Sequence, residues 1–400
     1  MNKETMIATS PSPTTIDKPQ AMDLEAALQT ALAQLSANLP RYATLFPDDT
    51  SRANHYEPRR FEHYAEGANT GWTTGFWTGM LWMAHELSGK TEFRDAALAQ
   101  LPGYGERLAK RINIDHHDLG FLYMPSCVAA YRITGDEGAR KIALDAADHL
   151  MQRYLPKAGI IQAWGDLSDP QQRGRIIIDC LMNLPLLHWA GGNERRSSYK
   201  AAAMTHALRS RDYLVRSDDS SFHTFHFDPQ TGAPLRGSTA QGWSDDSCWA
   251  RGQAWGIYGF ALNHRYAPHL GLLQVAMRQA DYFLRRLSAN GIACWDLAFD
   301  EHSGEPWDSS ASAIAVCGLL ELSDQMEEGE RRHRYRAAAL HILDGLVRLC
   351  AAKSGDSNAL LLHGVYSKPH GHGVDEANLW GDFFYLEALS RVARGTAGYW

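Results

Sequence analysis

The chain has 400 residues, of which 44% are hydrophobic and 21% are charged, and its formal net charge at pH 7 is −7. This composition is typical of a globular protein with a large core. The negative charge gives no indication of a nucleic-acid or anionic-membrane partner. No apolar run approaches the length that crosses a membrane.

The six cysteines form no CxxC pair, and several lie in apolar runs. They indicate buried thiols in a reducing, cytoplasmic compartment, and neither a disulfide set nor a zinc site. Residues 1–21 are rich in Ser, Thr and Pro and lack an apolar segment, so we expect a disordered tail and no secretory signal. Residues 22–400 contain no linker-like break, and we predict that they form one domain.

Helical periodicity begins after Met22, where apolar residues recur at spacings of three and four. The aromatic and apolar segment 73–88 predicts a buried helix that ends at Gly89. An apolar helix, a short polar turn and an Ala-rich amphipathic helix then follow one another repeatedly. The Ala-rich members begin near Thr91, Asp136, Tyr199, Leu272 and Tyr335.

Counting candidate helices gives roughly twelve, half of them apolar and half amphipathic. Both kinds of helix can be accommodated in two concentric rings, with the apolar helices as the inner ring of a closed toroid. An open superhelix is the alternative. Aromatic, glycine-bearing loops after Gly71, Gly165 and Gly242 favour the toroid, because they could converge at one mouth. In the long polar segment 217–247, the residues around His223 alternate in type as in a short β-strand. This pattern predicts a small β-hairpin at the rim.

Two aspartates have opposed surroundings in the sequence. Asp179 interrupts the apolar run 173–187, and full burial would raise its pKa and suit it to general acid catalysis. Asp118 precedes an apolar run where a helix begins, so the free amides and the helix dipole should favour its ionised form. Two carboxyl groups whose surroundings favour opposite ionisation states are typical of the acid and base pairs of active sites. A structural Asp179 and an ordinary N-cap at Asp118 remain the alternatives.

Arg251 lies between Trp249 and Trp255 in sequence. It could clamp a ligand carboxylate or equally pair with Asp245 or Asp246. No nucleotide cradle, HExxH motif or serine elbow is present, and His116-His117 has no matching partner pair for a metal. We therefore expect no metal and no cofactor. What remains is carboxylate chemistry on a carbohydrate-like ligand held by tryptophans, of which the chain has twelve.

Several segments, in order, resemble the bacterial unsaturated glucuronyl hydrolases of glycoside hydrolase family 88. They are DHHDLGFLY (115–123), GIIQAWG (159–165), RIIIDCLMNLPLL (175–187), DDSSFHTF (218–225), WARGQAWGIYGFAL (249–262), DSSASA (308–313) and LWGDFFYLEAL (379–389). The resemblance runs from about Thr70 to the C-terminus. It implies an all-α fold, the (α/α)6 barrel of six helical hairpins, which agrees with the helix count.

The resemblance also implies a reaction. Such enzymes act on oligosaccharides that polysaccharide lyases leave with a 4,5-unsaturated uronic acid at the non-reducing end, and they hydrate its vinyl ether. Asp179 would protonate C4 and then take a proton from the water that attacks C5, while Asp118 would contact sugar hydroxyls. His223 and Gln241 match residues near that water. The pocket lining would comprise Trp72, His117, Trp164, Trp249, Arg251 and Trp255.

The segment 363–372 is where members of the family differ in charge and length. Tyr366 and Lys368 would lie at the subsite of the next sugar, where Lys368 and Ser367 could receive a sulfate; a solvent-facing Lys368 is equally open. The alternatives are a rhamnogalacturonyl hydrolase, a sugar epimerase that uses His bases, and a non-catalytic carbohydrate-binding protein. We expect a monomer or a weak homodimer.

Overall fold

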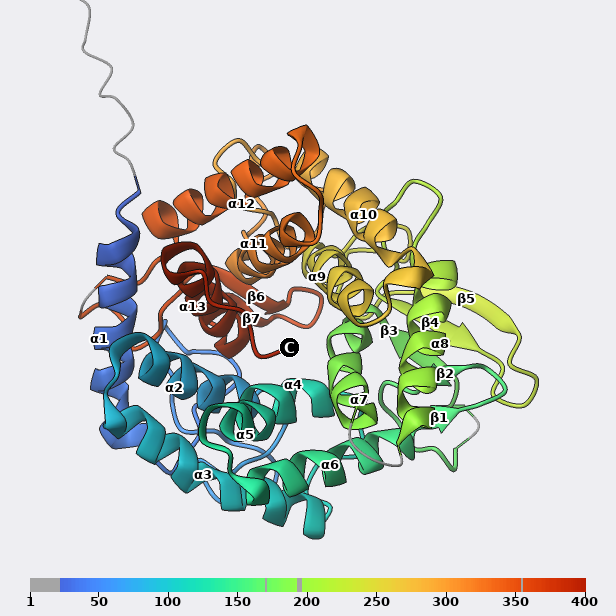
Figure 1. Ribbon diagram of the computed structural model, residues 1–400. Helices are drawn as coiled ribbons and strands as arrows, with labels where there is room; N and C mark the ends of the chain where they lie inside the picture. Colours follow the sequence, from blue (N-terminus) through green and yellow to red (C-terminus); the bar gives the residue numbers. More distant parts are fainter. Residues whose placement is uncertain (1–21, 170, 193–195, 354) are drawn as a thin grey trace, which may run out of the picture.

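Helices that are apolar on all sides form an inner ring in the computed structural model, which describes residues 22–169, 171–192, 196–353 and 355–400 (Figure 1). Almost every residue of α9 and α11 is buried, as expected of helices covered on all sides. The ring consists of α2 (Thr74–Ser88), α4 (Leu119–Tyr123) continued through a π-helical turn (Met124–Val128) into α5 (Ala129–Thr134), α7 (Leu184–Gly191), α9 (Ala250–Tyr266), α11 (Ser309–Asp324) and α13 (Leu379–Arg394).

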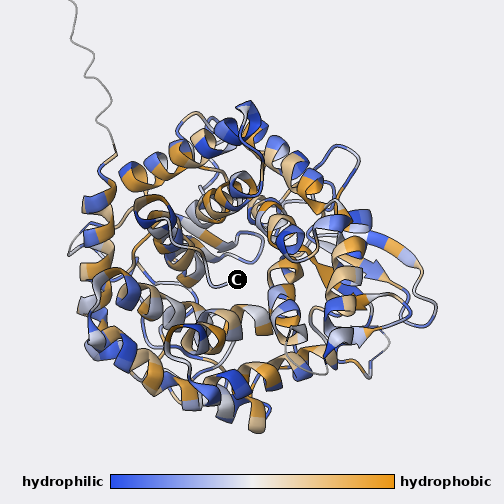
Figure 2. Ribbon diagram, in the orientation of Figure 1, coloured by the Kyte–Doolittle hydropathy of each residue, from blue (hydrophilic) through white to orange (hydrophobic). Residues whose placement is uncertain are grey.

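Amphipathic helices form the outer ring, and hydrophilic residues recur along them (Figure 2). Each buries small and apolar residues against the inner ring; α6, for example, buries four alanines and two leucines. The outer helices are α1 (Leu24–Tyr42), α3 (Thr91–Ala109), α6 (Glu137–Met151), α8 (Ser197–Leu214), α10 (Leu272–Arg286) and α12 (Glu330–Leu349). The described residues thus contain the twelve helical segments that the sequence predicts. The tail predicted for residues 1–21 lies outside the described ranges.

The rings close on themselves, because α13 packs against α2 and α1 at the start of the chain (Figure 1). Closure excludes the open superhelix and confirms the all-α (α/α)6 barrel. The predicted end of α2 is also confirmed: Gly89 adopts φ 70°, and its amide donates to the His85 carbonyl. No helix in the described ranges combines the length and apolar content that a membrane span requires.

Aromatic side chains fill the centre of the barrel. The Trp400 ring stacks on Phe384 with centroids 5.8 Å apart, and Phe121 contacts both Trp400 and Trp255. All six cysteines are buried free thiols, as predicted.

The described residues also contain short β-strands, labelled β1 to β7. The predicted hairpin is present as β4 (Thr224–Phe227) and β5 (Pro234–Ser238). An unpredicted strand, β3 (Arg175–Ile177), pairs antiparallel with β4 and runs directly into a 3₁₀ helix (Ile178–Met182) that carries Asp179. The other strands form two hairpins, β1 (Tyr154–Leu155) with β2 (Ile160–Ile161) and β6 (Gly364–Ser367) with β7 (His372–Glu376). A further 3₁₀ turn, η3 (Pro268–Leu270), precedes α10.

Candidate active site

A cavity of about 520 Å³ gathers most of the residues that the sequence singles out. The loops after Gly71, Gly165 and Gly242 were expected to share one mouth, and Trp72, Trp164 and Gln241 from these regions do line this cavity. The lining consists of Trp72, Asp118, Trp164, Ile177, Asp179, His223, Ala240, Gln241, Trp249, Arg251, Trp255, Tyr366, Ser367, His370 and His372. Of the twelve candidate site residues, ten are in this set; His117 contacts both aspartates without lining the cavity, and Lys368 also lies outside the lining.

Asp179 is less buried than the sequence indicates. Its side chain is 13% exposed, because it forms part of the cavity wall. Burial nevertheless raises its pKa to about 7; His117 opposes this rise and the negative charge of Asp118 adds to it. Its Oδ1 atom is buried without a hydrogen-bond partner among the described residues. The direction of the predicted pKa shift is confirmed.

Asp118 stays ionised, but not for the predicted reason. It directly precedes α4, yet its side chain accepts no capping hydrogen bond from the helix amides. Burial would raise its pKa, but attraction to His117 and a contact with His116 bring it well below the ordinary value. The His116 Nδ1 atom lies 3.1 Å from Asp118 Oδ2. Imidazole rings, and not the helix N-terminus, therefore hold the charge.

His117 sits between the two carboxyl groups. Its Nε2 atom lies 3.2 Å from Asp118 Oδ1 and 3.4 Å from Asp179 Oδ1, and its side chain is 1% exposed. Burial lowers the pKa of His117, but attraction to both aspartates outweighs burial and raises it well above the ordinary value. One atom from each of these three residues lies within 4.8 Å of the others, a spacing that could hold a cation. A metal needs a neutral imidazole, whereas these carboxylates favour the protonated ring.

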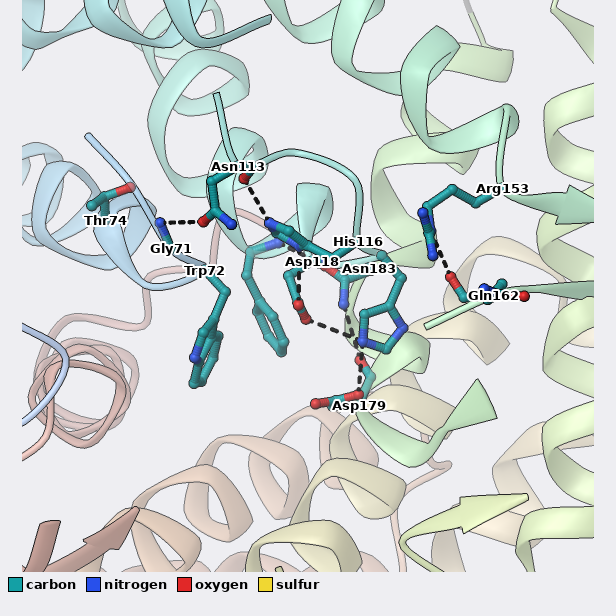
Figure 3. Close-up of polar contacts among 12 residues, drawn as sticks. Gly71, Trp72, Thr74, Asn113, His116, Asp118, Arg153, Gln162, Asp179 and Asn183 are labelled. Atoms are coloured by element: carbon teal, nitrogen blue, oxygen red, sulfur yellow. Dashed lines mark hydrogen bonds and ion pairs between the residues drawn. The ribbon is translucent and has the colours of Figure 1, made fainter. Parts of the chain in front are cut away.

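A buried polar network aligns the loop that carries Asp118 (Figure 3). The Asn113 side-chain oxygen accepts the Gly71 amide hydrogen at 2.6 Å, and the Asn113 carbonyl accepts from His116 Nε2 at 3.0 Å. Arg107 donates to the carbonyls of both Gly71 and Asn113. The network therefore ties Trp72, which follows Gly71, to the His116 ring beside Asp118.

We expect Asn113→Ala to lower the free energy of unfolding by about 1–3 kcal/mol, because the buried Gly71 amide loses its acceptor. Displacement of Trp72 should raise KM more than it lowers kcat. Chemical denaturation and steady-state kinetics measure the two effects. Asn113→Asp keeps the acceptor oxygen and is the matched control; equal losses in both variants would contradict this role.

Asn183 brings the two aspartates together (Figure 3). Its side-chain oxygen accepts the Phe121 amide hydrogen at 2.8 Å, and its Nδ2 donates to the Asp179 carbonyl at 3.3 Å. The approach requires glycine at position 120, since a Cβ there would lie 2.3 Å from the Asn183 Cα. Helix α4 and the 3₁₀ helix therefore meet with Asp118 and Asp179 facing one another.

Arg251 does not pair with Asp245 or Asp246; that alternative is wrong. Its Nη1 donates to Asp308 Oδ2 at 2.9 Å, and its other contacts include the carbonyls of Val365 and Tyr366. The guanidinium lies between the rings of Trp249 and Trp380, at 4.5 and 4.9 Å from their centroids. Trp380, and not Trp255, is thus the second indole. Arg251 lines the cavity while holding strand β6 against the barrel.

His223 is a neutral hydrogen-bond donor to the cavity. Burial, with help from the positive charges of Arg251 and His117, lowers its pKa to about 3. Its Nδ1 accepts the Ala240 amide hydrogen at 3.1 Å and contacts the Thr224 hydroxyl. The ring proton must therefore be on Nε2.

The β6–β7 hairpin supplies both predicted and unpredicted residues. The Tyr366 hydroxyl accepts from Trp72 Nε1 at 2.9 Å. The Lys368 ammonium lies 3.1 Å from Glu305, outside the cavity lining. His370 and His372, which sequence reasoning did not select, do line the cavity. Their signal was the His-Gly-His sequence of residues 370–372.

Comparison with known proteins places the chain in a family. The family model for Glycosyl Hydrolase Family 88 matches residues 48–394. The chain belongs to this family. It is 46% identical to the unsaturated glucuronyl hydrolase of Bacillus sp. (strain GL1), over 94% of this chain and 98% of that protein. It is 43% identical to the unsaturated chondroitin disaccharide hydrolase of Streptococcus pyogenes serotype M1, over 94% and 93%.

A solved family 88 structure has the same fold. The mutant unsaturated glucuronyl hydrolase of Streptococcus agalactiae complexed with dGlcA-GalNAc6S superposes with a TM-score of 0.82 at 40% identity, covering 94% of this chain and 93% of that one. Family 88 membership makes this chain a glycoside hydrolase, as the sequence resemblance implies.

Proposed function

We propose that this enzyme removes a terminal 4,5-unsaturated uronic acid from lyase-generated oligosaccharides by hydrating the C4=C5 bond. The observation that carries the proposal is the pairing of Asp179, whose pKa is about 7, with an ionised Asp118 across His117. Protonating a vinyl ether needs a carboxylic acid that keeps its proton near neutrality. The names of the family relatives support the same substrate class.

The reaction runs through Asp179 twice. The Asp179 carboxylic acid gives its proton to C4, and the resulting carboxylate takes a proton from the water that adds to C5. The C5 hemiketal then opens: the bond between C5 and the ring oxygen breaks, and C5 becomes a ketone. The ring oxygen is left as a hydroxyl on C1. This hemiacetal then collapses: the bond between C1 and the glycosidic oxygen breaks, C1 becomes an aldehyde, and the next sugar leaves with the glycosidic oxygen as its hydroxyl.

We propose that Asp118 binds sugar hydroxyls and does not activate a second water. Inverting glycosidases hold a water between carboxyl groups about 6.5–9.5 Å apart. Here an oxygen of Asp118 lies within 4.8 Å of an oxygen of Asp179, with His117 against both. We propose that His223 Nε2–H and Gln241 orient the attacking water, and that the cavity tryptophans and Arg251 position the uronate ring and its carboxylate.

The preferred source is proposed to be a glycosaminoglycan, because one relative is named for unsaturated chondroitin disaccharide. Sulfate binding by Lys368 and Ser367 stays a prediction; Lys368 would have to leave Glu305 to serve it. Free buried thiols support a cytoplasmic location. We propose that the protein is a monomer or a weak homodimer, and sedimentation velocity at several concentrations measures which.

We expect kcat/KM to fall as the pH rises above about 7. Asp179 must be protonated to act, and its raised pKa keeps it protonated below about pH 7 and ionised above it. Activity should therefore be retained on the acidic side and drop roughly tenfold per pH unit on the alkaline side. A profile of kcat/KM between pH 5 and 9 measures this, and a plateau extending to pH 9 would speak against Asp179 as the acid.

Loss of ultraviolet absorbance tests the proposal as a whole. The conjugated C4=C5 acid absorbs, and hydration removes its band. The wild-type enzyme should bleach unsaturated chondroitin or hyaluronan disaccharides faster than a rhamnogalacturonan disaccharide. Faster bleaching of the latter would favour the rhamnogalacturonyl alternative. An ultraviolet band that stays unchanged with every disaccharide would exclude the hydrolase, and the epimerase and the carbohydrate-binding protein would remain as alternatives.

A further inference from the structure

An aromatic surface lies outside the cavity, on the loops that follow Gln241 and Trp295. The Trp243 side chain is 61% exposed, a rare exposure for so large an apolar group. Its ring contacts Phe299 edge-on, with centroids 5.4 Å apart, and Phe299 contacts Trp295 at 5.8 Å. The indole is thus held from one side by other rings while much of it remains open to solvent.

This surface is rigidly joined to the cavity wall. The Trp243 amide donates to Asp296 Oδ2 at 3.0 Å, and the backbone of Asp296 pairs with that of Trp249, a cavity residue. Gln241, two positions before Trp243, lines the cavity and donates to the Tyr366 carbonyl. The aromatic surface therefore keeps a fixed position relative to the site.

A polar contact links the β6–β7 hairpin, beside the cavity, to the ring of Trp295. Glu305 accepts from Trp295 Nε1 at 2.8 Å and pairs with Lys368, which follows the cavity residue Ser367. Polar groups beside the cavity and the exposed indole of Trp243 thus meet at the same ring cluster. Sugars present hydroxyls at their edges and C–H groups on their faces, so this combination of polar groups and an exposed ring suits a continuing oligosaccharide chain.

We propose that Trp243, supported by Phe299, binds a sugar beyond the two that a disaccharide supplies. This inference rests on the proposed function, because it extends the same site. The occupant is a neutral or anionic hexose of an unsaturated tetrasaccharide, stacked by its C–H face on the indole, with Lys368 and Glu305 facing the preceding residue. The surface gives the enzyme a preference for longer chains.

The test compares an unsaturated hyaluronan disaccharide with the corresponding tetrasaccharide. Trp243→Ala should lower kcat/KM for the tetrasaccharide roughly three- to tenfold through KM, the size of a single aromatic stack, and change the disaccharide value less than twofold. Trp243→Phe should restore most of the tetrasaccharide rate. Leu235→Ala is the matched control, since Leu235 is 62% exposed on β5, and it should alter neither substrate.

Two results would overturn the inference: equal losses on both substrates in Trp243→Ala, or no loss on either. Both leave the proposed function standing, provided that the wild-type enzyme still bleaches the disaccharide. Failure of the wild-type enzyme on the disaccharide would instead remove the proposed function on which the inference rests.

Discussion

Replacing Asp179 by asparagine is expected to lower kcat by roughly 10³-fold or more while the protein stays folded. The amide has the shape of the protonated acid but can neither give its proton to C4 nor take one from water. Because burial already favours the neutral carboxyl group, a neutral amide should cost no stability. The rate of loss of the ultraviolet band measures activity, and thermal unfolding measures the fold.

Asp115→Asn is the matched control for this change. Asp115 lies on the loop that carries Asp118, but its side chain is 59% exposed and pairs with Arg111. It should keep nearly full activity. Retention of more than about a tenth of wild-type kcat in Asp179→Asn would rule out the role of Asp179 as proton donor.

Arg251→Met is expected to lower the free energy of unfolding by about 3–5 kcal/mol, the usual result of leaving one member of a buried ion pair alone. Asp308 is fully buried and has Arg251 as its paired cation. The variant also loses the bonds from Arg251 to the Val365 and Tyr366 carbonyls. Strand β6 should loosen and KM should rise. Chemical denaturation gives the stability.

Two further variants separate this pair from a general effect of removing arginine. Arg278→Met removes an exposed ion pair with Asp219 and should cost no more than about 1 kcal/mol. Adding Asp308→Asn to Arg251→Met should recover about 1–3 kcal/mol, because asparagine can still cap α11. An Arg251→Met variant as stable as Arg278→Met would show that the pair is unimportant.

Periodicity was sufficient to separate inner from outer helices, because an inner helix is apolar on all sides and an outer helix on one. It did not distinguish a closed toroid from an open superhelix, for which the aromatic loops were needed. It also located the end of α2, where Gly89 takes a left-handed conformation. It did not reveal β3. Three residues near the start of the apolar run 173–187 have no period of their own, and their strand character comes from pairing with β4, 47 to 51 residues later in the chain.

A site residue could be predicted where its polarity differs from that of its neighbours in the sequence. Asp179 in an apolar run is such a residue, and burial is the main cause of its raised pKa. Partners distant in sequence were not predictable: Asp308 lies 57 positions from Arg251, and no local pattern selects it over Asp245. The ionisation of Asp118 was expected for the wrong reason, because the direction of the His117 ring is set by tertiary packing.

The most direct test of hydration at C4=C5 is proton NMR of an unsaturated disaccharide turned over in D₂O. The account predicts that the vinyl signal of C4 disappears as the next sugar is released, and that C4 gains a single deuterium of one configuration from Asp179. Release of an unsaturated uronate that still carries its C4 vinyl proton would contradict it, since ordinary displacement at C1 would then be the reaction.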